Sequence, residues 1–433
     1  MTPTGFIHDL QWSDLPAQVR RRAEMCLLDL IGVAAGGATT RLSRIIRDHA
    51  AGHFTGPRAM LFDQRTASAP GTALAAGMTI DALDGHDGYN PAKGHIGCPL
   101  FPAILAMADR DTPGTEALTA LVMGYEFGAR ASVAQHRTVP DYHTSGSWGA
   151  VTAAAASARL AGLNADRTRH ALGIAEYHGP RSQMMRCIDH PTMLKDGSGW
   201  GAMAGVSACL LAADGFTGAP AVTVEDAPDF WSGLGEKWLI MEQYFKPYPV
   251  CRWAHAPVEG VLALRRAHNL TGERVERIEV ETFHEAVCLA TNRPRTTEEA
   301  QYSTSFPCAV AMVRGGVKAD DIGENALDDP EILRLSTSMT MTESDRANAA
   351  FPDRRLARVS LILTDGTRLD GPYLTPKWDA GLPPSEAELR EKYHGLADPV
   401  IGPARASAIE NALNALPDTG FGALTDHLCR PIS

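Results

Sequence analysis

The chain has 433 residues, of which 44% are hydrophobic, 6% aromatic and 21% charged. This composition is typical of a globular protein, argues against a disordered or fibrous chain, and predicts two or three domains at roughly 100–200 residues each. The net charge of −11 argues against nucleic acid or an anionic membrane as a partner. Every apolar run is broken well short of the roughly 20 residues that cross a bilayer, so we expect a soluble protein.

The N-terminus and the cysteines bear on the compartment. Residues 1–16 contain His8, Asp9 and Asp14 and lack the cationic start and long apolar core of a secretory signal. The 8 cysteines are scattered, without a CxxC pair or a Cys/His block at zinc spacing. We therefore expect reduced thiols in a cytoplasmic protein, with no zinc site and no iron–sulfur cluster.

From Leu15 to about Phe216 the chain is predicted to form helices separated by short Gly/Pro turns. Apolar residues recur at helical spacing from Val19 to Ile31, which gives the first helix one buried face. Further helices are predicted at residues 102–109, 116–134, 147–160, 165–175 and 199–213. The alanines between Ala150 and Ala158 would let neighbouring helices approach closely. These features predict a tight helical bundle.

The pattern changes after His255. Alternating residues over 274–283 predict a strand, and Asp365-Gly366 predicts a hairpin turn between two more strands, because this dipeptide tolerates positive φ. Helices are predicted at 304–314, 385–392 and 404–416. We expect a mainly α protein with an all-helical domain over residues 1–255, a smaller α+β domain over 256–399, and a C-terminal helix at 400–433 packing back on the first domain.

The densest polar cluster lies between Asp81 and Pro99, in a Gly/Pro-rich loop between two predicted helices. It contains Asp84, His86, Asp87, Lys93 and His95. A solvated loop rarely carries so many titratable groups, and such clusters are typical of functional sites. The same mixture of oxygen and imidazole ligands is compatible with a metal-dependent hydratase that uses Asp84, His86, Asp87 and His95. We favour a site without metal, because no regular ligand spacing is visible.

A second polar segment, residues 141–149, precedes an alanine-rich helix. Two interpretations stay open. Either a hydroxyl group of Thr144, Ser145 or Ser147 caps the helix, or His143 lies at a helix N-terminus where backbone N–H groups favour an anionic ligand.

Cations mark two further segments. Lys195 lies at the entrance of a small-residue helix, where the helix dipole disfavours a positive charge; we interpret it as a carboxylate anchor or a proton carrier. A Schiff-base role is also open, although no partner motif accompanies it. Lys246 and Arg252 lie in a Pro- and aromatic-rich segment that ends at His255. This segment is either an ordinary surface turn or a site that recognises carboxylates.

Together these groups predict a catalytic scheme. Several cations would hold a di- or tricarboxylate, while His and Asp side chains move a proton at the carbon next to a carboxylate. The sequence contains no GxGxxG after a strand, no GxxxxGK[ST], no GxSxG and no HExxH. We therefore expect no cofactor.

Several segments taken in chain order resemble the MmgE/PrpD family, which includes 2-methylcitrate dehydratase, cis-aconitate decarboxylase and iminodisuccinate epimerase. The resemblance covers nearly the whole chain. The segments that carry it are Cys26–Ala34, Ala82-Leu83-Asp84…His95…Pro102-Ala103, Gly124-Tyr125-Glu126, His143-Thr144-Ser145-Gly146, Lys195…Gly205, Gly215-Phe216-Thr217-Gly218, Lys246-Pro247-Tyr248-Pro249-Val250-Cys251-Arg252, Leu363-Thr364-Asp365-Gly366 and Leu389…Lys392-Tyr393.

The resemblance implies a helical domain closed by an α+β lid, a homodimer, and a metal-free site at the domain boundary. His95 would be the proton donor and acceptor, supported by Asp84, while Lys195, Lys246 and His143 hold carboxylates or a developing enediolate. We also assign substrate binding to Arg252, His255, His86, Asp87 and Lys93. The family often has Ser-Leu-Pro-Tyr where this chain has Ser305-Phe306-Pro307-Cys308. A lid hydroxyl is therefore missing, and Tyr302 is a candidate replacement.

The leading functional hypothesis is a cofactor-independent hydro-lyase that acts on a small hydroxy-polycarboxylate, similar to 2-methylcitrate dehydratase. A decarboxylase or an epimerase would use a similar carbanion-like intermediate and stays an alternative. A carboxylate-binding protein without activity is disfavoured, because binding alone has little need of a proton-transfer set.

Overall fold

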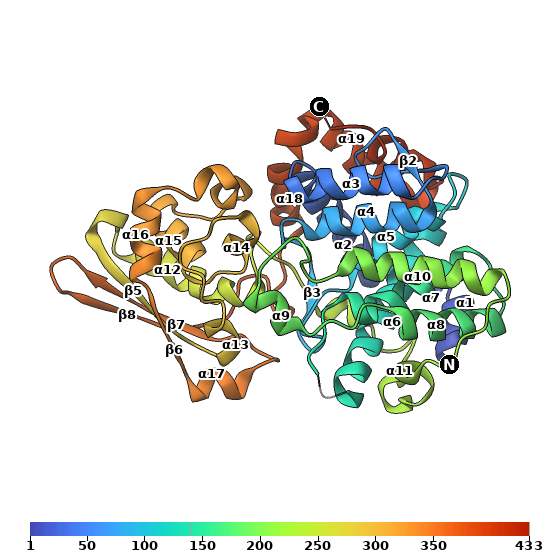
Figure 1. Cartoon of the computed structure of the whole chain (residues 1–433), viewed down its shortest axis with the longest axis horizontal. Coiled ribbons are helices and arrows are strands. Elements are labelled where there is room, and N and C mark those ends of the chain that lie inside the picture. The colour runs from blue at the N-terminus through green and yellow to red at the C-terminus, as the bar shows by residue number, and fades with distance from the viewer. Residues whose placement is uncertain (140, 433) are drawn as a thin grey trace.

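Residues 1–139 and 141–432 are described by a computed structural model in which two domains lie side by side (Figure 1). The larger domain is built mainly from the first eleven helices, which confirms the mainly α fold. These are α1 Pro3–Asp9, α2 Ala17–Gly37, α3 Arg41–His53, α4 Ala69–Asp81, α5 Gly97–Met107, α6 Gly114–Thr138, α7 Gly146–Leu160, α8 Ala165–His178, α9 Met184–Asp189, α10 Ser198–Ala213 and α11 Val222–Glu225.

The helical domain packs through small residues, as its composition predicts. A Cβ atom added at Gly205 on α10 would lie 2.4 Å from the Ala150 carbonyl oxygen and 2.6 Å from the Ala153 Cβ on α7. At Gly77 on α4 it would lie 2.5 Å from the Gly199 Cα. Contacts this close leave no room for larger side chains, so the alanine and glycine content sets the spacing of α4, α7 and α10.

Two details of the helical domain differ from the sequence prediction. Helix α5 begins at Gly97 instead of Pro102, because its first turn accommodates Pro99, where no N–H partner is required. The domain is also not purely helical. Strand β1 Arg58–Ala59 pairs with β2 Thr66–Ala67, and β3 Gly88–Tyr89 pairs with β4 Gln243–Tyr244. The β3–β4 pair lies at the site described below.

The smaller domain contains a four-stranded sheet in the order β6-β5-β7-β8. Strands β5 and β6 are parallel, and β7 and β8 form the predicted antiparallel hairpin around Gly366, whose φ is +87°. Helices α12, α15 and α16 pack with this sheet around a separate apolar core (Figure 1). The elements are α12 His255–Ala267, β5 Val275–Thr282, α13 His284–Val287, α14 Thr297–Gln301, α15 Ser305–Arg314, α16 Pro330–Ser338, β6 Thr340–Glu343, α17 Asp345–Ala350, β7 Ala357–Leu363 and β8 Arg368–Leu374.

The chain then returns to the helical domain through α18 Glu386–Ile401, α19 Pro403–Asn414 and α20 Gly422–Leu428 (Figure 1). Helix α18 packs on α2, and the buried Lys392 Nζ lies 2.5 Å from Asp29 Oδ1 of that helix. Trp378 already belongs to the core of the helical domain, and its carbonyl oxygen accepts from the Phe245 N–H. The return therefore begins before α18, inside the range 256–399 predicted for the α+β domain. Helical periodicity located this segment but could not say which domain it joins.

In the described residues, no single helix is both long and apolar enough to cross a bilayer. Helices α2 and α3 meet the criterion of length and composition only as a pair, across a bend of 95°. Most residues of α2 are buried in the helical core, as is typical of a central helix in a large domain.

Candidate active site

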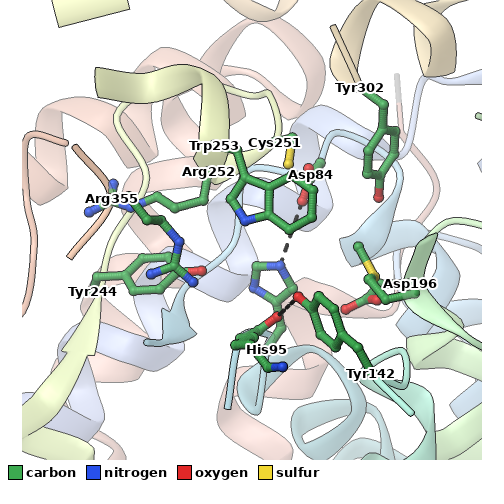
Figure 2. A pocket seen from close by; sticks show the side chains of 12 residues that line it. Asp84, His95, Tyr142, Asp196, Tyr244, Cys251, Arg252, Trp253, Tyr302 and Arg355 are labelled. Atoms are coloured by element: carbon green, nitrogen blue, oxygen red, sulfur yellow. Dashed lines mark hydrogen bonds and ion pairs between the residues drawn. The ribbon is translucent and has the colours of Figure 1, made fainter. Parts of the chain in front are cut away.

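A narrow cavity lies where the two domains meet, and both contribute to its walls (Figure 2). Its free volume is about 20 Å³, room for little more than one water molecule, so the lining side chains lie close together. Polar and aromatic groups dominate the lining, which consists of Asp84, Lys93, His95, Tyr142, Met184, Asp196, Tyr244, Cys251, Arg252, Trp253, Tyr302 and Arg355. The structure thus brings together four predicted site residues: Asp84, Lys93, His95 and Arg252.

The polar loop between α4 and α5 is fixed by its pairing with a distant segment. Gly88 of β3 lies opposite Tyr244 of β4, and a Cβ atom at Gly88 would lie only 2.3 Å from the Tyr244 hydroxyl oxygen. Glycine is therefore required at this contact. Because Lys246 follows β4 directly, the same pairing brings its ammonium group to the loop.

Three predicted site residues have a left-handed backbone. The φ angles are +48° at Asp84, +52° at Lys93 and +53° at Lys195. A non-glycine residue in this region is uncommon and costs roughly 1–3 kcal/mol when the surroundings hold it there. The structure maintains this strain at residues that surround one cavity, as is common in binding and catalytic sites.

Asp84 and Lys246 form a buried ion pair at the base of the cavity. Lys246 Nζ lies 2.5 Å from Asp84 Oδ1 and also donates to the Asp84 carbonyl oxygen at 2.8 Å. Burial alone would raise the pKa of Asp84, but the ammonium groups of Lys246 and Lys195 hold it well below its usual range. Asp84 is therefore a carboxylate at neutral pH.

His95 is the base that faces this carboxylate. Its Nδ1 lies 2.5 Å from the Asp87 carbonyl oxygen, which can only accept, so Nδ1 carries the proton and Nε2 has a free lone pair. Nε2 lies 3.8 Å from Asp84 Oδ1 (Figure 2). Burial, together with neighbouring His86 and Lys246, lowers the pKa of His95 well below its usual value. At neutral pH His95 is a neutral base whose imidazolium form Asp84 would stabilise.

His86 and Asp87 lie behind His95 and do not line the cavity. The His86 and His95 rings meet edge to face at 4.2 Å, and His86 Nε2 lies 3.3 Å from Asp81 Oδ1. The Asp87 carboxyl turns the other way and accepts a 2.5 Å hydrogen bond from the Tyr125 hydroxyl. Burial raises the pKa of Asp87 to about 7. The structure gives both residues positioning contacts to His95, so their direct contact with a substrate stays a prediction.

Lys195 connects the helical domain to the lid. Its buried ammonium group donates to Gln301 Oε1 and lies 4.6 Å from the centre of the Tyr302 ring. Gln301 Nε2 in turn donates to the Ala82 carbonyl oxygen at 3.1 Å. Tyr302 of the lid therefore brings a hydroxyl group to the cavity. Cys308, in contrast, lies buried in the core of the lid.

Three cations, Lys93, Arg252 and Arg355, line the cavity. Some N–H groups of the two arginines make no hydrogen bond in the described residues. Arg252 and Arg355 lie 4.3 Å and 5.6 Å from the centre of the Tyr244 ring, and Lys93 lies 4.0 Å from the centre of the Tyr142 ring. In the described part of the chain, Nε and Nη2 of Arg252 and Nε of Arg355 are buried without a hydrogen-bond partner. Burial lowers the pKa of Arg252 to about 10, which leaves it charged at neutral pH.

Two predicted histidines lie outside the cavity lining. His143 Nδ1 lies 2.8 Å from the Asp141 carbonyl oxygen, three residues before α7 begins. His255 is fully buried beneath the ring of Tyr248, and its Nε2 lies 3.1 Å from the Val250 carbonyl oxygen. Burial lowers the pKa of His255 well below its usual value, and Arg252 adds to the effect. Contact of either histidine with a substrate stays a prediction.

The metal alternative can be examined at the same loop. Potential ligand atoms of Asp84, His86 and His95 lie within 4.8 Å of one another. The Lys246 ammonium group already contacts the Asp84 carboxylate at 2.5 Å, and a second cation there would be repelled. Asp87, the fourth ligand of that alternative, directs its carboxyl toward Tyr125. The arrangement favours Lys246 as the charge partner of Asp84.

Several lining residues were not among those predicted from the sequence. Asp196 and Tyr142 lie next to Lys195 and His143 in segments that were singled out, so proximity to a predicted residue was the available signal. Arg355 lies in a stretch without a motif, between α17 and β7. Its buried guanidinium donates to Asn90 Oδ1 in the polar loop, a contact across 265 positions that no local pattern indicates.

The fold and this cavity define a two-domain protein that encloses an acid–base pair and several guanidinium groups beneath an α+β lid. The chain belongs to the MmgE/PrpD family: the N-terminal domain of that family matches residues 4–237 and its C-terminal domain residues 248–418.

Proteins similar to this chain include a cis-aconitate decarboxylase-like protein, oryM, of Aspergillus oryzae, which is 26% identical over 95% of this chain and 93% of its own length. A cis-aconitate decarboxylase of Aspergillus terreus is 24% identical over 96% of this chain and 92% of its own length. Both similarities span the two domains together.

Proposed function

We propose that this protein is a cofactor-independent lyase acting on a small di- or tricarboxylic acid, first of all a hydro-lyase that removes water from a hydroxy-polycarboxylate. The observation that carries the proposal is the tautomer of His95. Its Nδ1–H is held by the Asp87 carbonyl oxygen at 2.5 Å, and its Nε2 lone pair faces a cavity lined by cations. A neutral base beside fixed positive charge suits proton abstraction next to a carboxylate.

The cations account for the substrate class. In the described residues, Nε of Arg252 and Nε of Arg355 have no hydrogen-bond partner, and Arg252 Nη2 lies 3.6 Å from Asp379 Oδ1. Guanidinium groups match the geometry and charge of carboxylates, which accept hydrogen bonds from them in pairs. Lys93 adds a third cation to the lining. Binding a carboxylate at the reacting carbon would also stabilise the enediolate that forms when the proton leaves.

The reaction would follow from these positions. His95 Nε2 takes the proton from the carbon next to a carboxylate, and the electron pair of that C–H bond forms a C=C bond. Hydroxide leaves from the neighbouring carbon and takes up a proton, so that water and an unsaturated acid are produced. The Asp84 carboxylate stabilises the imidazolium that remains on His95.

A decarboxylase is the second candidate, because the similar proteins from Aspergillus are named as cis-aconitate decarboxylases or as similar to one. In that reaction a carboxylate carbon leaves as CO₂ and the electron pair is protonated at carbon. An epimerase would instead return the proton to the other face of the same carbanion. The hydro-lyase and the epimerase would both begin with His95 as the base, whereas the decarboxylase needs a group that donates a proton to carbon. All three would use the same carboxylate subsites.

The test is to incubate chelator-treated protein with citrate, 2-methylcitrate, cis-aconitate and iminodisuccinate in D₂O and to follow the products by NMR. An unsaturated acid formed from a hydroxy acid supports the hydro-lyase. Release of CO₂ would show that the protein is a decarboxylase. Inverted stereochemistry of the substrate would show that it is an epimerase. Tight binding without turnover or deuterium exchange would contradict catalysis. Activity that requires an added divalent ion would contradict the metal-free site.

We also propose that the protein is a homodimer in the cytoplasm. The outer face of α10 and the segment before it exposes apolar side chains, namely Leu194, Trp200, Leu210 and Leu211, and patches of this kind mark interaction surfaces. A second copy of the chain is the partner we expect. Light scattering should give the dimer mass for the wild type and a lower mass for Leu211→Glu, while Leu382→Glu, at an exposed position in the segment between β8 and α18, should leave the mass unchanged.

A further inference from the structure

The mechanism above leaves one buried acid of the cavity unused. Asp196 lies between Lys195 and the start of α10, lines the cavity (Figure 2) and is only 3% exposed. No Lys, Arg or His of the described residues lies within 4.0 Å of its carboxyl group, in contrast to Asp84, which has Lys246. A buried carboxylate without a cation is costly, so a proton is the expected charge partner.

The hydrogen bonds of Asp196 show which oxygen would carry that proton. The Ser145 hydroxyl donates to Asp196 Oδ2 and accepts from the His95 backbone N–H at 2.8 Å. Since the Ser145 hydrogen is directed to Oδ2, that oxygen acts as an acceptor. Asp196 Oδ1 is buried and has no partner among the described residues. Because Asp196 lines the cavity, Oδ1 is the oxygen left to bond a molecule that enters it.

We propose that Asp196 is the general acid of the reaction, donating its proton from Oδ1 to the hydroxyl group that leaves the substrate. This inference rests on the proposed hydro-lyase function. His95 Nε2 accepts the proton from carbon, the C–O bond breaks, and the departing oxygen takes the Asp196 proton and leaves as water. One proton has then moved from carbon to His95 and one from Asp196 to oxygen, and exchange with solvent restores both groups.

The surroundings of Asp196 keep it protonated. Burial and the negative charge of Asp81 raise its pKa to about 8, in spite of the hydrogen bond from Ser145. Other titratable groups also face Asp196. They are Asp84 of the polar loop, Tyr142 before α7, Cys187 of α9, Cys98 of α5 and Tyr302 of the lid. Lys195 beside it is directed to Gln301, and the cavity also contains Lys93, His95, Arg252 and Arg355.

The same Ser145 hydroxyl links the acid to the base. By accepting from the His95 N–H and donating to Asp196, it fixes both groups on one wall of the cavity. Ser145 makes no side-chain capping hydrogen bond to α7, so this one of the three hydroxyl groups predicted as caps is directed elsewhere. It instead donates its hydrogen bond to Asp196.

The experiment compares two leaving groups. The substrates are 2-methylcitrate or citrate, whichever the wild type dehydrates, and the same acid with fluorine in place of the hydroxyl group. Hydroxide needs a proton in order to leave, whereas fluoride does not. We expect Asp196→Asn to lower kcat for water loss by about 10²–10⁴-fold and fluoride loss by less than about 10-fold. Asp214→Asn, exposed at the other end of α10, is the control and should change neither.

Other outcomes separate the two proposals. Equal losses of water and fluoride elimination in Asp196→Asn would overturn the role of Asp196 while leaving the hydro-lyase in place. A wild type that releases water from neither acid would overturn both. The pH profile gives a further readout: the acid works only when protonated, so wild-type kcat should fall above about pH 8, and Asp196→Asn should lose that decline.

A measurement without substrate tests the protonation directly. In protein labelled with ¹³C at the aspartate side-chain carboxyl carbon, the signal that disappears in Asp196→Asn should titrate near pH 8. Titration of that signal below about pH 5 would show a carboxylate at neutral pH and overturn the proposal, whatever the substrate.

Discussion

The two walls of the cavity differ in the chemistry they supply. The helical domain contributes groups that can move protons, namely Asp84, His95 and Asp196, whereas the lid side contributes Arg252, Trp253 and Arg355. The first set is packed against a rigid core of closely spaced helices. In the second set, Arg252 and Trp253 directly precede α12, and Arg355 lies between α17 and β7. We infer that the helical wall determines the reaction and the lid wall determines which acid is bound.

The largest effect is expected at the base of the helical wall. His95→Gln removes the Nε2 lone pair while keeping a side chain of similar size, and should lower kcat and deuterium exchange by about 10²–10⁴-fold, the usual contribution of a general base. His190→Gln, at an exposed position after α9, is the matched control and should retain activity. Full exchange in His95→Gln would mean that the proton is taken by another group.

The next largest effect is expected on the stability of the fold, when the ion pair between Lys246 and Asp84 is broken. Lys246→Met leaves the Asp84 carboxylate buried without its ammonium partner at 2.5 Å, and loss of one member of a buried pair costs about 3–5 kcal/mol. Urea unfolding should show this loss in the free energy of unfolding. The double variant Lys246→Met with Asp84→Asn should recover most of it without recovering activity. An unchanged unfolding midpoint in the single variant would contradict the pairing.

The lid wall should affect binding more than chemistry. Arg355→Met removes a buried guanidinium, and hydrogen bonds to charged groups contribute about 1.5–3 kcal/mol, so KM should rise by about 10–100-fold with kcat little changed. Arg358→Met, which replaces an arginine paired with Glu281 on the sheet, should leave KM unchanged. A fall in kcat with constant KM would place Arg355 in the proton-transfer step and remove the distinction between the two walls.

The smallest effect is expected from mild acidification. His95 acts as a base only when neutral, and burial holds its pKa well below the ordinary value of 6.5. The acid limb of kcat/KM, which reports groups of the free enzyme, should therefore lie well below pH 6.5, and the rate should stay level as the pH falls from 7 to 6.5. A decline centred at or above pH 6.5 would show that His95 is solvated.

Local sequence patterns predicted much of the fold and part of the site. The periodic helices over 116–134, 147–160 and 199–213 are present as α6, α7 and α10, and the Asp365-Gly366 turn closes the β7–β8 hairpin. Asp84, Lys93, His95 and Arg252 could be singled out because titratable residues rarely gather in Gly- and Pro-rich segments. All four line the cavity.

The remaining site residues could not be found in this way. Arg355 carries no local signal, because an isolated arginine has the same appearance on a surface as in a site. Trp253 directly follows the predicted Arg252, and this proximity was its one signal. Asp196 differs from other aspartates only through what surrounds it: a serine from another segment, nearby carboxylates and no cation. Its protonation depends on burial, which is a property of the folded chain.

The sequence by itself determined the mainly α character, the polar loop between Asp81 and Pro99 and the cations Lys93 and Arg252, since each depends on residues close together in the chain. The tertiary structure decided which side chains meet: Lys246 with Asp84, Lys392 with Asp29, Arg355 with Asn90 and Ser145 with Asp196. These pairs join segments from distant parts of the chain. Their energies arise from desolvation and charge at short range, which exist only after the helical core and the lid have packed together.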